Sequence, residues 1–141
     1  MFAAVAATFE DLCRLWTETQ GLAERLPFKP EIVGSDWKGA HFQADVLAVD
    51  WRQGKALIGE AKWGDHPVAL ADYVSLKERA AKVIARMPLE RKRTWEIHYA
   101  VFARRGFAPA LMTAAKAHKA QLVTFAQVVR DLEATRVRLI R

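Results

Sequence analysis

Apolar residues in the first part of the chain change from helical spacing to strand spacing. From Phe9 to Trp16 they recur every three or four residues, which predicts an amphipathic helix with Thr8 as its N-cap. The two prolines of residues 26–31 end this helix. Strands are then predicted at 31–37, 41–50 and 56–63. The last two form a hairpin around Gly54, and the strand at 41–50 is apolar on both faces, which predicts a central position.

The second half of the chain alternates helices with strands. Pro67 suits the first turn of a helix that the pattern extends from Val68 to about Arg86. After a basic connection come a strand at 95–103, a loop and helix at 106–120, a strand at 121–125 and a helix at 126–134. This order predicts an α/β fold with a mixed central sheet. Its first three strands are an antiparallel meander, and right-handed helical crossovers lead to the parallel strands.

The composition fits a single domain spanning residues 1–141. The sequence is 52% hydrophobic and 27% charged, as in ordinary globular proteins. No apolar run approaches the roughly 20 residues of a membrane span, and Met1–Ala7 lacks a basic leader, so we expect a cytoplasmic protein without a membrane partner. The single cysteine, Cys13, lies among apolar helical positions and is expected in the core.

The net charge of +6 permits attraction to a polyanion such as nucleic acid. The basic connection contains Arg91, Lys92 and Arg93, and further cations, including Lys77 and Arg79, precede it. These side chains could follow a nucleic-acid backbone. The alternative is a solvated basic surface.

Charged residues interrupt the apolar strand at 56–63. Glu60 and Lys62 share one face of this strand because side chains alternate. A two-residue hairpin turn would place Asp45 opposite Lys62, and a four-residue turn would place it opposite Glu60. Buried unpaired charges cost several kcal/mol. A hard divalent cation such as Mg²⁺ or Mn²⁺ would relieve this cost, and the alternative is a structural salt bridge between Lys62 and one acid.

These residues resemble a known catalytic pattern. Asp45, followed by Glu60-Ala61-Lys62 at the end of a hairpin strand and preceded by a helix with Glu10, is similar to the PD-(D/E)XK nuclease superfamily. The stretches TFEDLCRLW, EIVGSDW, QADVLAVD and GEAKW resemble, in order, the nuclease-like C-terminal domain of unknown function found behind archaeal-type AAA+ ATPases. This resemblance covers roughly residues 8–86. Many relatives read Glu-Ile-Asp at positions 43–45, where this chain has Gln-Ala-Asp, and no GxxxxGK[ST] motif of an ATPase is present.

The resemblance implies a restriction-endonuclease-like α-β-β-β-α-β core with an added β-α unit. It implies that Asp45 and Glu60 bind Mg²⁺ or Mn²⁺, with Glu10 and the backbone carbonyl of Ala61 as further ligands. Lys62 would orient the attacking water or stabilise charge on the phosphate during hydrolysis of DNA.

Candidate substrate-binding residues are Gln43, Lys77, Arg91, Lys92 and Arg93. The alternative function is a non-catalytic DNA-binding or docking module of an ATPase. A homodimer is a further expectation, since cutting both strands of a duplex usually needs two sites related by a two-fold axis.

Overall fold

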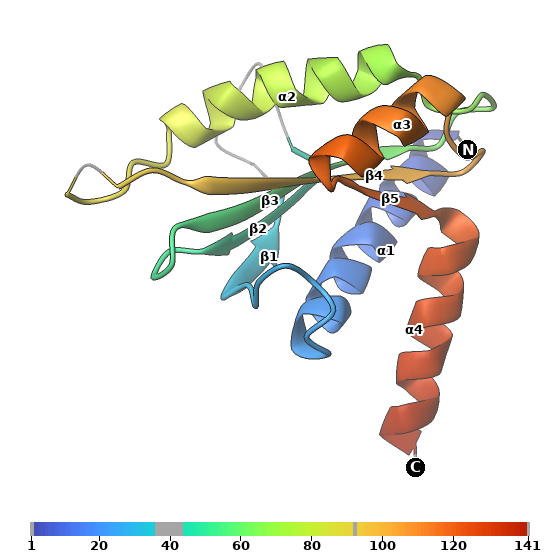
Figure 1. The fold of residues 1–141 in the computed structure, drawn as a ribbon. Coiled ribbons are helices and arrows are strands. Elements are labelled where there is room, and N and C mark those ends of the chain that lie inside the picture. The colour runs from blue at the N-terminus through green and yellow to red at the C-terminus, as the bar shows by residue number, and fades with distance from the viewer. Residues whose placement is uncertain (1, 36–43, 92, 141) are drawn as a thin grey trace.

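The computed structural model describes residues 2–35, 44–91 and 93–140, and these form four helices and five strands (Figure 1). In chain order the elements are α1 (Phe2–Leu22), β1 (Ile32–Gly34), β2 (Val46–Asp50), β3 (Lys55–Lys62), α2 (Leu70–Ala85), β4 (Glu96–Ala103), α3 (Pro109–His118), β5 (Gln121–Thr124) and α4 (Phe125–Ile140).

The strands form one mixed sheet in the order β1-β2-β3-β4-β5. β2 is antiparallel to both of its neighbours, β1 and β3, whereas β4 runs parallel to both β3 and β5. The predicted α/β class, the antiparallel meander and the parallel continuation are confirmed. β2 lies between β1 and β3, so its predicted interior position is also confirmed.

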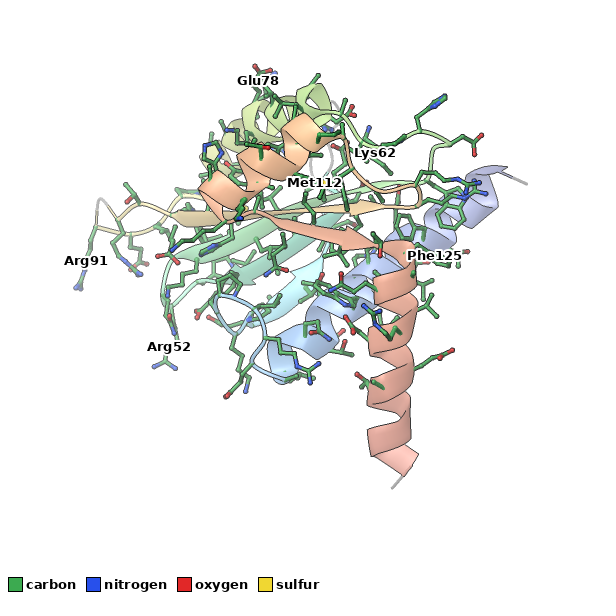
Figure 2. The ribbon with its side chains drawn as sticks, turned by 45° about the vertical axis from the view of Figure 1, so that its right-hand side comes forward. Arg52, Lys62, Glu78, Arg91, Met112 and Phe125 are labelled. Atoms are coloured by element: carbon green, nitrogen blue, oxygen red, sulfur yellow. The ribbon has the colours of Figure 1, made fainter. Side chains whose placement is uncertain are left out.

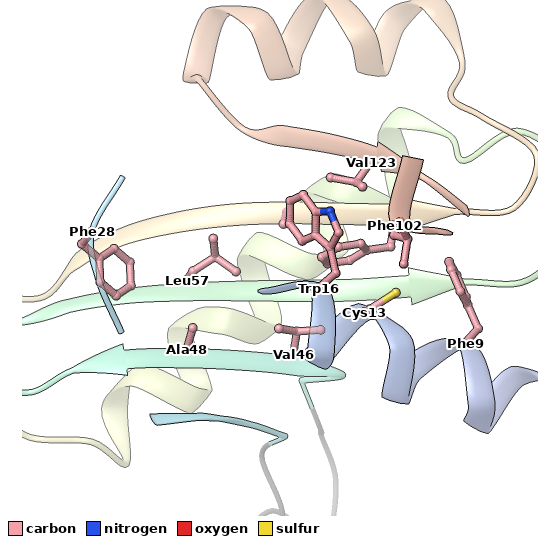
Figure 3. Close-up of a cluster of buried hydrophobic side chains, with 11 residues drawn as sticks. Phe9, Cys13, Trp16, Phe28, Val46, Ala48, Leu57, Phe102 and Val123 are labelled. Carbon is pink, nitrogen blue, oxygen red and sulfur yellow. The ribbon is translucent and has the colours of Figure 1, made fainter. Parts of the chain in front are cut away.

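Helices cover both faces of the sheet, which gives three layers (Figure 1). On the face of α1 and α4, buried residues such as Trp16 and Val128 pack with Leu57 and Phe102 of the sheet (Figure 3). Cys13 is fully buried in this cluster, as expected. On the other face, Tyr73, Leu76 and Leu111 of α2 and α3 pack with Ile58 and Val101.

The helix boundaries correct three predictions. α1 begins at Phe2, so Thr8 lies inside the helix and is not its N-cap; alanines at four of positions 3–7 favour this extension. α2 begins only at Leu70, because Val68 hydrogen-bonds with the backbone of Gly106 and Ala108 and forms an isolated bridge with Phe107. Pro67 therefore precedes the first turn. α4 continues to Ile140, beyond the predicted end.

The first two strands are shorter in the described residues than the sequence predicts. β1 covers Ile32–Gly34 and β2 covers Val46–Asp50. Residues 36–43, which include the end of the first predicted strand and the start of the second, lie outside the described residues.

The β2–β3 hairpin decides between the two predicted turn lengths. Asp50 pairs with Lys55 and Val46 pairs with Gly59, so the turn contains the four residues 51–54. Gly54 ends this turn with φ +68°, a conformation that glycine adopts without strain. The pairing ends at Val46 and Gly59, so Asp45 and Glu60 are the next residues along the two sides of the hairpin, as the four-residue turn requires.

Candidate functional site

Asp45 and Glu60 lie at the end of the β2–β3 hairpin that is remote from its turn. Asp45 directly precedes β2, and its Oδ2 accepts a hydrogen bond of 2.9 Å from the backbone N–H of Ala61 on β3. This bond fixes the Asp45 carboxylate beside the strand that carries Glu60 and Lys62. Sequence spacing and the four-residue turn together account for the arrangement.

Glu60 is paired with two cations. Its residue is only 8% exposed, and Oε1 accepts a hydrogen bond of 2.7 Å from Nη2 of Arg79 on α2. Lys62 Nζ lies 3.4 Å from the same oxygen. Both pairs are charge-assisted, and the Arg79 bond is short and strong for its kind. A buried carboxylate that would be costly alone is thereby neutralised.

α1 adds further polar groups near Asp45. Arg14 Nη1 donates a hydrogen bond of 2.8 Å to the backbone oxygen of Asp45, and Arg14 also pairs with Asp11. Burial raises the pKa of Glu10, and the negative charge of Asp45 raises it further. The charges of Glu10, on α1, and Asp45 therefore interact unfavourably.

The site makes negative charge unfavourable at Asp45. Burial is the main cause of its raised pKa, and the charge of Glu60 adds to the effect. The Ala61 N–H, Lys62 and Arg79 act in the opposite direction without cancelling it. A cation bound between the acids would therefore stabilise a carboxylate that the folded protein holds at a cost.

The donor chemistry of these acids suits a magnesium ion. In this conformation no three acidic, histidine or cysteine side chains of the described residues are grouped closely enough to hold a metal. Mg²⁺ is commonly bound through only one or two carboxylates, with waters and substrate phosphate completing its octahedral shell. Asp45 and Glu60 supply two such carboxylates, so the residues fit the ion.

Other predicted site residues lie elsewhere. Arg93 Nη2 donates a hydrogen bond of 2.8 Å to the backbone oxygen of Arg52, in the hairpin turn. This turn and Glu60 lie toward opposite ends of β3, about 16 Å apart at the usual rise per strand residue. Figure 2 shows Arg91 and Arg52 at one end of the molecule and Lys62 far from them. The structure therefore does not bring Arg91 or Arg93 to the acids.

Lys77 is not brought to the acids either. Its Nζ lies over the ring of Tyr73, 5.0 Å from the centroid. Lys77 and Arg79 are two positions apart on α2, and such residues face different sides of a helix. Gln43 and Lys92 lie outside the described residues.

Sequence reasoning missed the specific roles of Arg79 and Arg14. In the sequence, Arg79 is only one of several cations that could contact nucleic acid. It lies three positions after the buried Leu76, beside the apolar stripe of its helix. That position is the available signal, because a cation bordering a buried stripe can reach into the sheet. Arg14 contacts a backbone oxygen, which no side-chain motif reveals.

The fold and this site define an α/β domain with two neighbouring acids, a lysine and an arginine at the end of its central hairpin. A family model matches residues 3–84, and the chain belongs to this family, DUF234, described as archaea bacterial proteins of unknown function. The match includes Glu10, Asp45, Glu60, Lys62 and Arg79. No curated protein and no solved structure matches the chain. Within the described residues, no helix has the length and apolar character needed to cross a membrane.

Proposed function

We propose that this protein is a cytoplasmic, divalent-metal-dependent nuclease of the PD-(D/E)XK type that hydrolyses phosphodiester bonds in DNA. The observation that carries the proposal is the register of the β2–β3 hairpin. It ends with the pair Val46–Gly59, so Asp45 and Glu60 are the next residues along the two sides of the hairpin. Asp45 accepts a hydrogen bond from the Ala61 N–H, and Lys62 lies 3.4 Å from Glu60. An Asp and a Glu-x-Lys are therefore neighbours in space as well as ordered in sequence.

Each residue has a distinct task in this proposal. Asp45 and Glu60 would hold Mg²⁺ or Mn²⁺, with Glu10 and the Ala61 carbonyl as further oxygen donors. The bound ion would stabilise charge on the phosphate and lower the pKa of a water molecule. Lys62 would stabilise the negative charge that builds on the phosphate during attack. Arg79, now paired with Glu60, is a second cation on the same side of the sheet.

One observation favours a second candidate function. Arg79 and Lys62 already neutralise Glu60, so the cluster could instead be a structural ion network. The domain would then be a non-catalytic DNA-binding or docking module, with an ATPase module or a second copy of the chain as its partner. The two candidates differ in whether the acids bind a divalent ion and whether DNA is cut.

A nicking assay on supercoiled plasmid tests the proposal. The protein is expected to convert the plasmid to the open circle with Mg²⁺ or Mn²⁺ and not with EDTA. Asp45→Asn should abolish both nicking and Mn²⁺ binding by calorimetry. Lys62→Gln should reduce nicking at least 100-fold while retaining Mn²⁺ binding, because it removes charge stabilisation only.

The matched control is Asp65→Asn, an exposed acid paired with Arg104 outside the cluster. It should nick at the unmodified rate. Mn²⁺ binding without nicking would support the docking module. Nicking that survives Asp45→Asn would indicate a contaminating nuclease and refute the proposed site.

A further inference from the structure

A second candidate site lies between α2 and α3, above β4. It is a pocket of about 210 Å³, below the 300–1,000 Å³ usual for drug-sized ligands. Its lining residues are Tyr73, Lys77, Ile97, His98, Tyr99, His118 and Lys119. The two helices lie side by side over the sheet (Figure 2). Because Lys77 and Arg79 face different sides of α2, this pocket is separate from the acids at Glu60.

The pocket has a positive lining. Lys77 lines it from α2, and Lys119 lines it from the C-terminal end of α3. His118, the last residue of α3, also belongs to the lining. The described lining contains no carboxylate, and neither lysine forms an ion pair within the described part of the chain. Lys77 lies over the Tyr73 ring and the Glu96 carboxylate pairs with His98, but no carboxylate of the described residues neutralises either lysine, which favours an anionic ligand.

A buried donor in the same lining lacks a partner. Tyr73 is 1% exposed, and its hydroxyl is a buried side-chain oxygen with no hydrogen-bond partner among the residues that the structure describes. Its ring is held by an edge contact with Tyr99 at 5.9 Å and by His118 at 6.3 Å. Buried hydroxyl groups are normally hydrogen-bonded, so this one, on a residue of the pocket lining, points to an acceptor that the described residues do not supply.

We propose that this pocket binds a phosphate group, carried by a small molecule or by the end of a nucleic acid. Phosphate oxygens are acceptors, which match the ammonium groups of Lys77 and Lys119 and the hydroxyl of Tyr73. The small volume suits a phosphate group with little attached to it. The inference does not rest on the nuclease proposal, because it uses none of the residues around Glu60.

Titrations followed by ¹⁵N NMR test this site in the full chain. Inorganic phosphate is expected to bind saturably and to shift amide signals of residues 73, 77 and 119 together. Two oligonucleotides of one sequence, with and without a 5′-phosphate, distinguish a phosphate on a nucleic-acid end from one on a small molecule. Tighter binding of the phosphorylated oligonucleotide, about tenfold, assigns the group to a nucleic-acid end. Equal affinity of the two, with inorganic phosphate still bound, assigns it to a small molecule.

Matched variants distinguish a built site from general attraction. Lys77→Gln and Lys119→Gln should each weaken phosphate binding about tenfold, and Tyr73→Phe, which keeps the ring, should weaken it severalfold. Lys82→Gln removes an exposed charge of α2 outside the lining and should change affinity less than twofold. Glu60→Gln should leave binding unchanged. Each variant's NMR spectrum shows whether it is folded.

Three results would overturn the inference. They are the absence of saturable phosphate binding, an equal loss in Lys82→Gln and Lys77→Gln, and loss of binding in Glu60→Gln. The last would place the phosphate at the acids instead of the pocket. Phosphate binding is measured without a nicking assay, so failure of this proposal and failure of the nuclease proposal are distinguishable.

Discussion

At the residue scale, Asp45 is a carboxylate that the fold holds at a cost. Burial raises its pKa in the folded state above the ordinary value of 3.8. The proton is then bound more tightly by the folded chain than by the unfolded chain, and the associated stability is present below pH 3.8 and lost as pH rises through the folded pKa. At neutral pH the ionised Asp45 therefore destabilises the protein.

Replacing this carboxylate should stabilise the fold while removing function. Asp45→Asn keeps an oxygen that can accept the Ala61 N–H, and it should raise the free energy of unfolding at pH 7 by about 0.5–1 kcal/mol. Urea denaturation at pH 7 and at successively lower pH measures this, and the gain should shrink toward pH 3.8. Glu78→Gln, an exposed acid of α2, is the control and should show no gain. A loss of stability at pH 7 would contradict the burial argument.

Arg79 gives a second test at this scale. Arg79→Gln leaves the nearly buried Glu60 with Lys62 as its described cationic partner, which should destabilise the protein by about 1–3 kcal/mol. If Glu60 is a metal ligand, Mg²⁺ should stabilise this variant more than the unmodified protein, since binding to the folded state adds stability by mass action. Urea denaturation with and without Mg²⁺ measures both effects.

Arg105→Gln, at an exposed position, is the control for loss of one arginine charge. It should unfold like the unmodified protein at every Mg²⁺ concentration. An Mg²⁺ effect of the same size in Arg79→Gln and in the unmodified protein would count against competition between Arg79 and the metal at Glu60.

At the scale of elements, periodicity was sufficient for the order of helices and strands and for the parallel and antiparallel pairings. Periodicity did not predict where the helices begin and end, because tertiary contacts decide these boundaries. Val68 leaves the predicted helix because its backbone bonds to Gly106 and Ala108, 38 or more residues away in sequence. Alternation predicted that Asp45 lies near Glu60 and Lys62 but left the turn length open, whereas Arg79 reaches Glu60 only through the packing of α2 on the sheet. Sequence periodicity does not specify such packing contacts.

The hairpin turn that sets this register can be tested through Gly54. A Cβ at this position would lie 3.0 Å from Leu89 Cδ1 and 3.2 Å from Arg93 Nη2, and φ +68° is strained for any side chain. Gly54→Ala should therefore lower the free energy of unfolding by about 1–2 kcal/mol in urea denaturation. Gly64→Ala meets nothing within 4 Å and should change it by less than about 0.5 kcal/mol. Equal effects would show that the turn conformation is not constrained.

At the scale of the whole molecule, positive charge is divided between the two ends of the sheet. Arg14, Lys62 and Arg79 surround the acids, whereas Arg91 and Arg93 lie beside the hairpin turn. If the proposed nuclease activity is present, DNA that contacts both groups would use the second for affinity and the first for chemistry. Along β3, Lys55 beside the turn and Glu60 are about 16 Å apart, which corresponds to roughly five base pairs of duplex at 3.4 Å each.

This division predicts that loss of Arg91 and Arg93 changes mainly KM, whereas loss of Lys62 changes mainly kcat. The double variant Arg91→Gln with Arg93→Gln should raise KM for duplex DNA severalfold and leave kcat within about twofold, because phosphate contacts remote from the cut position the substrate without stabilising the transition state. Its binding should also depend less on salt, with the slope of log affinity against log salt reduced by about 1–2. Lys62→Gln should lower kcat at nearly unchanged KM. A large loss of kcat in the double variant would mean that the loop reaches the scissile phosphate, which the hydrogen bond from Arg93 to the turn opposes.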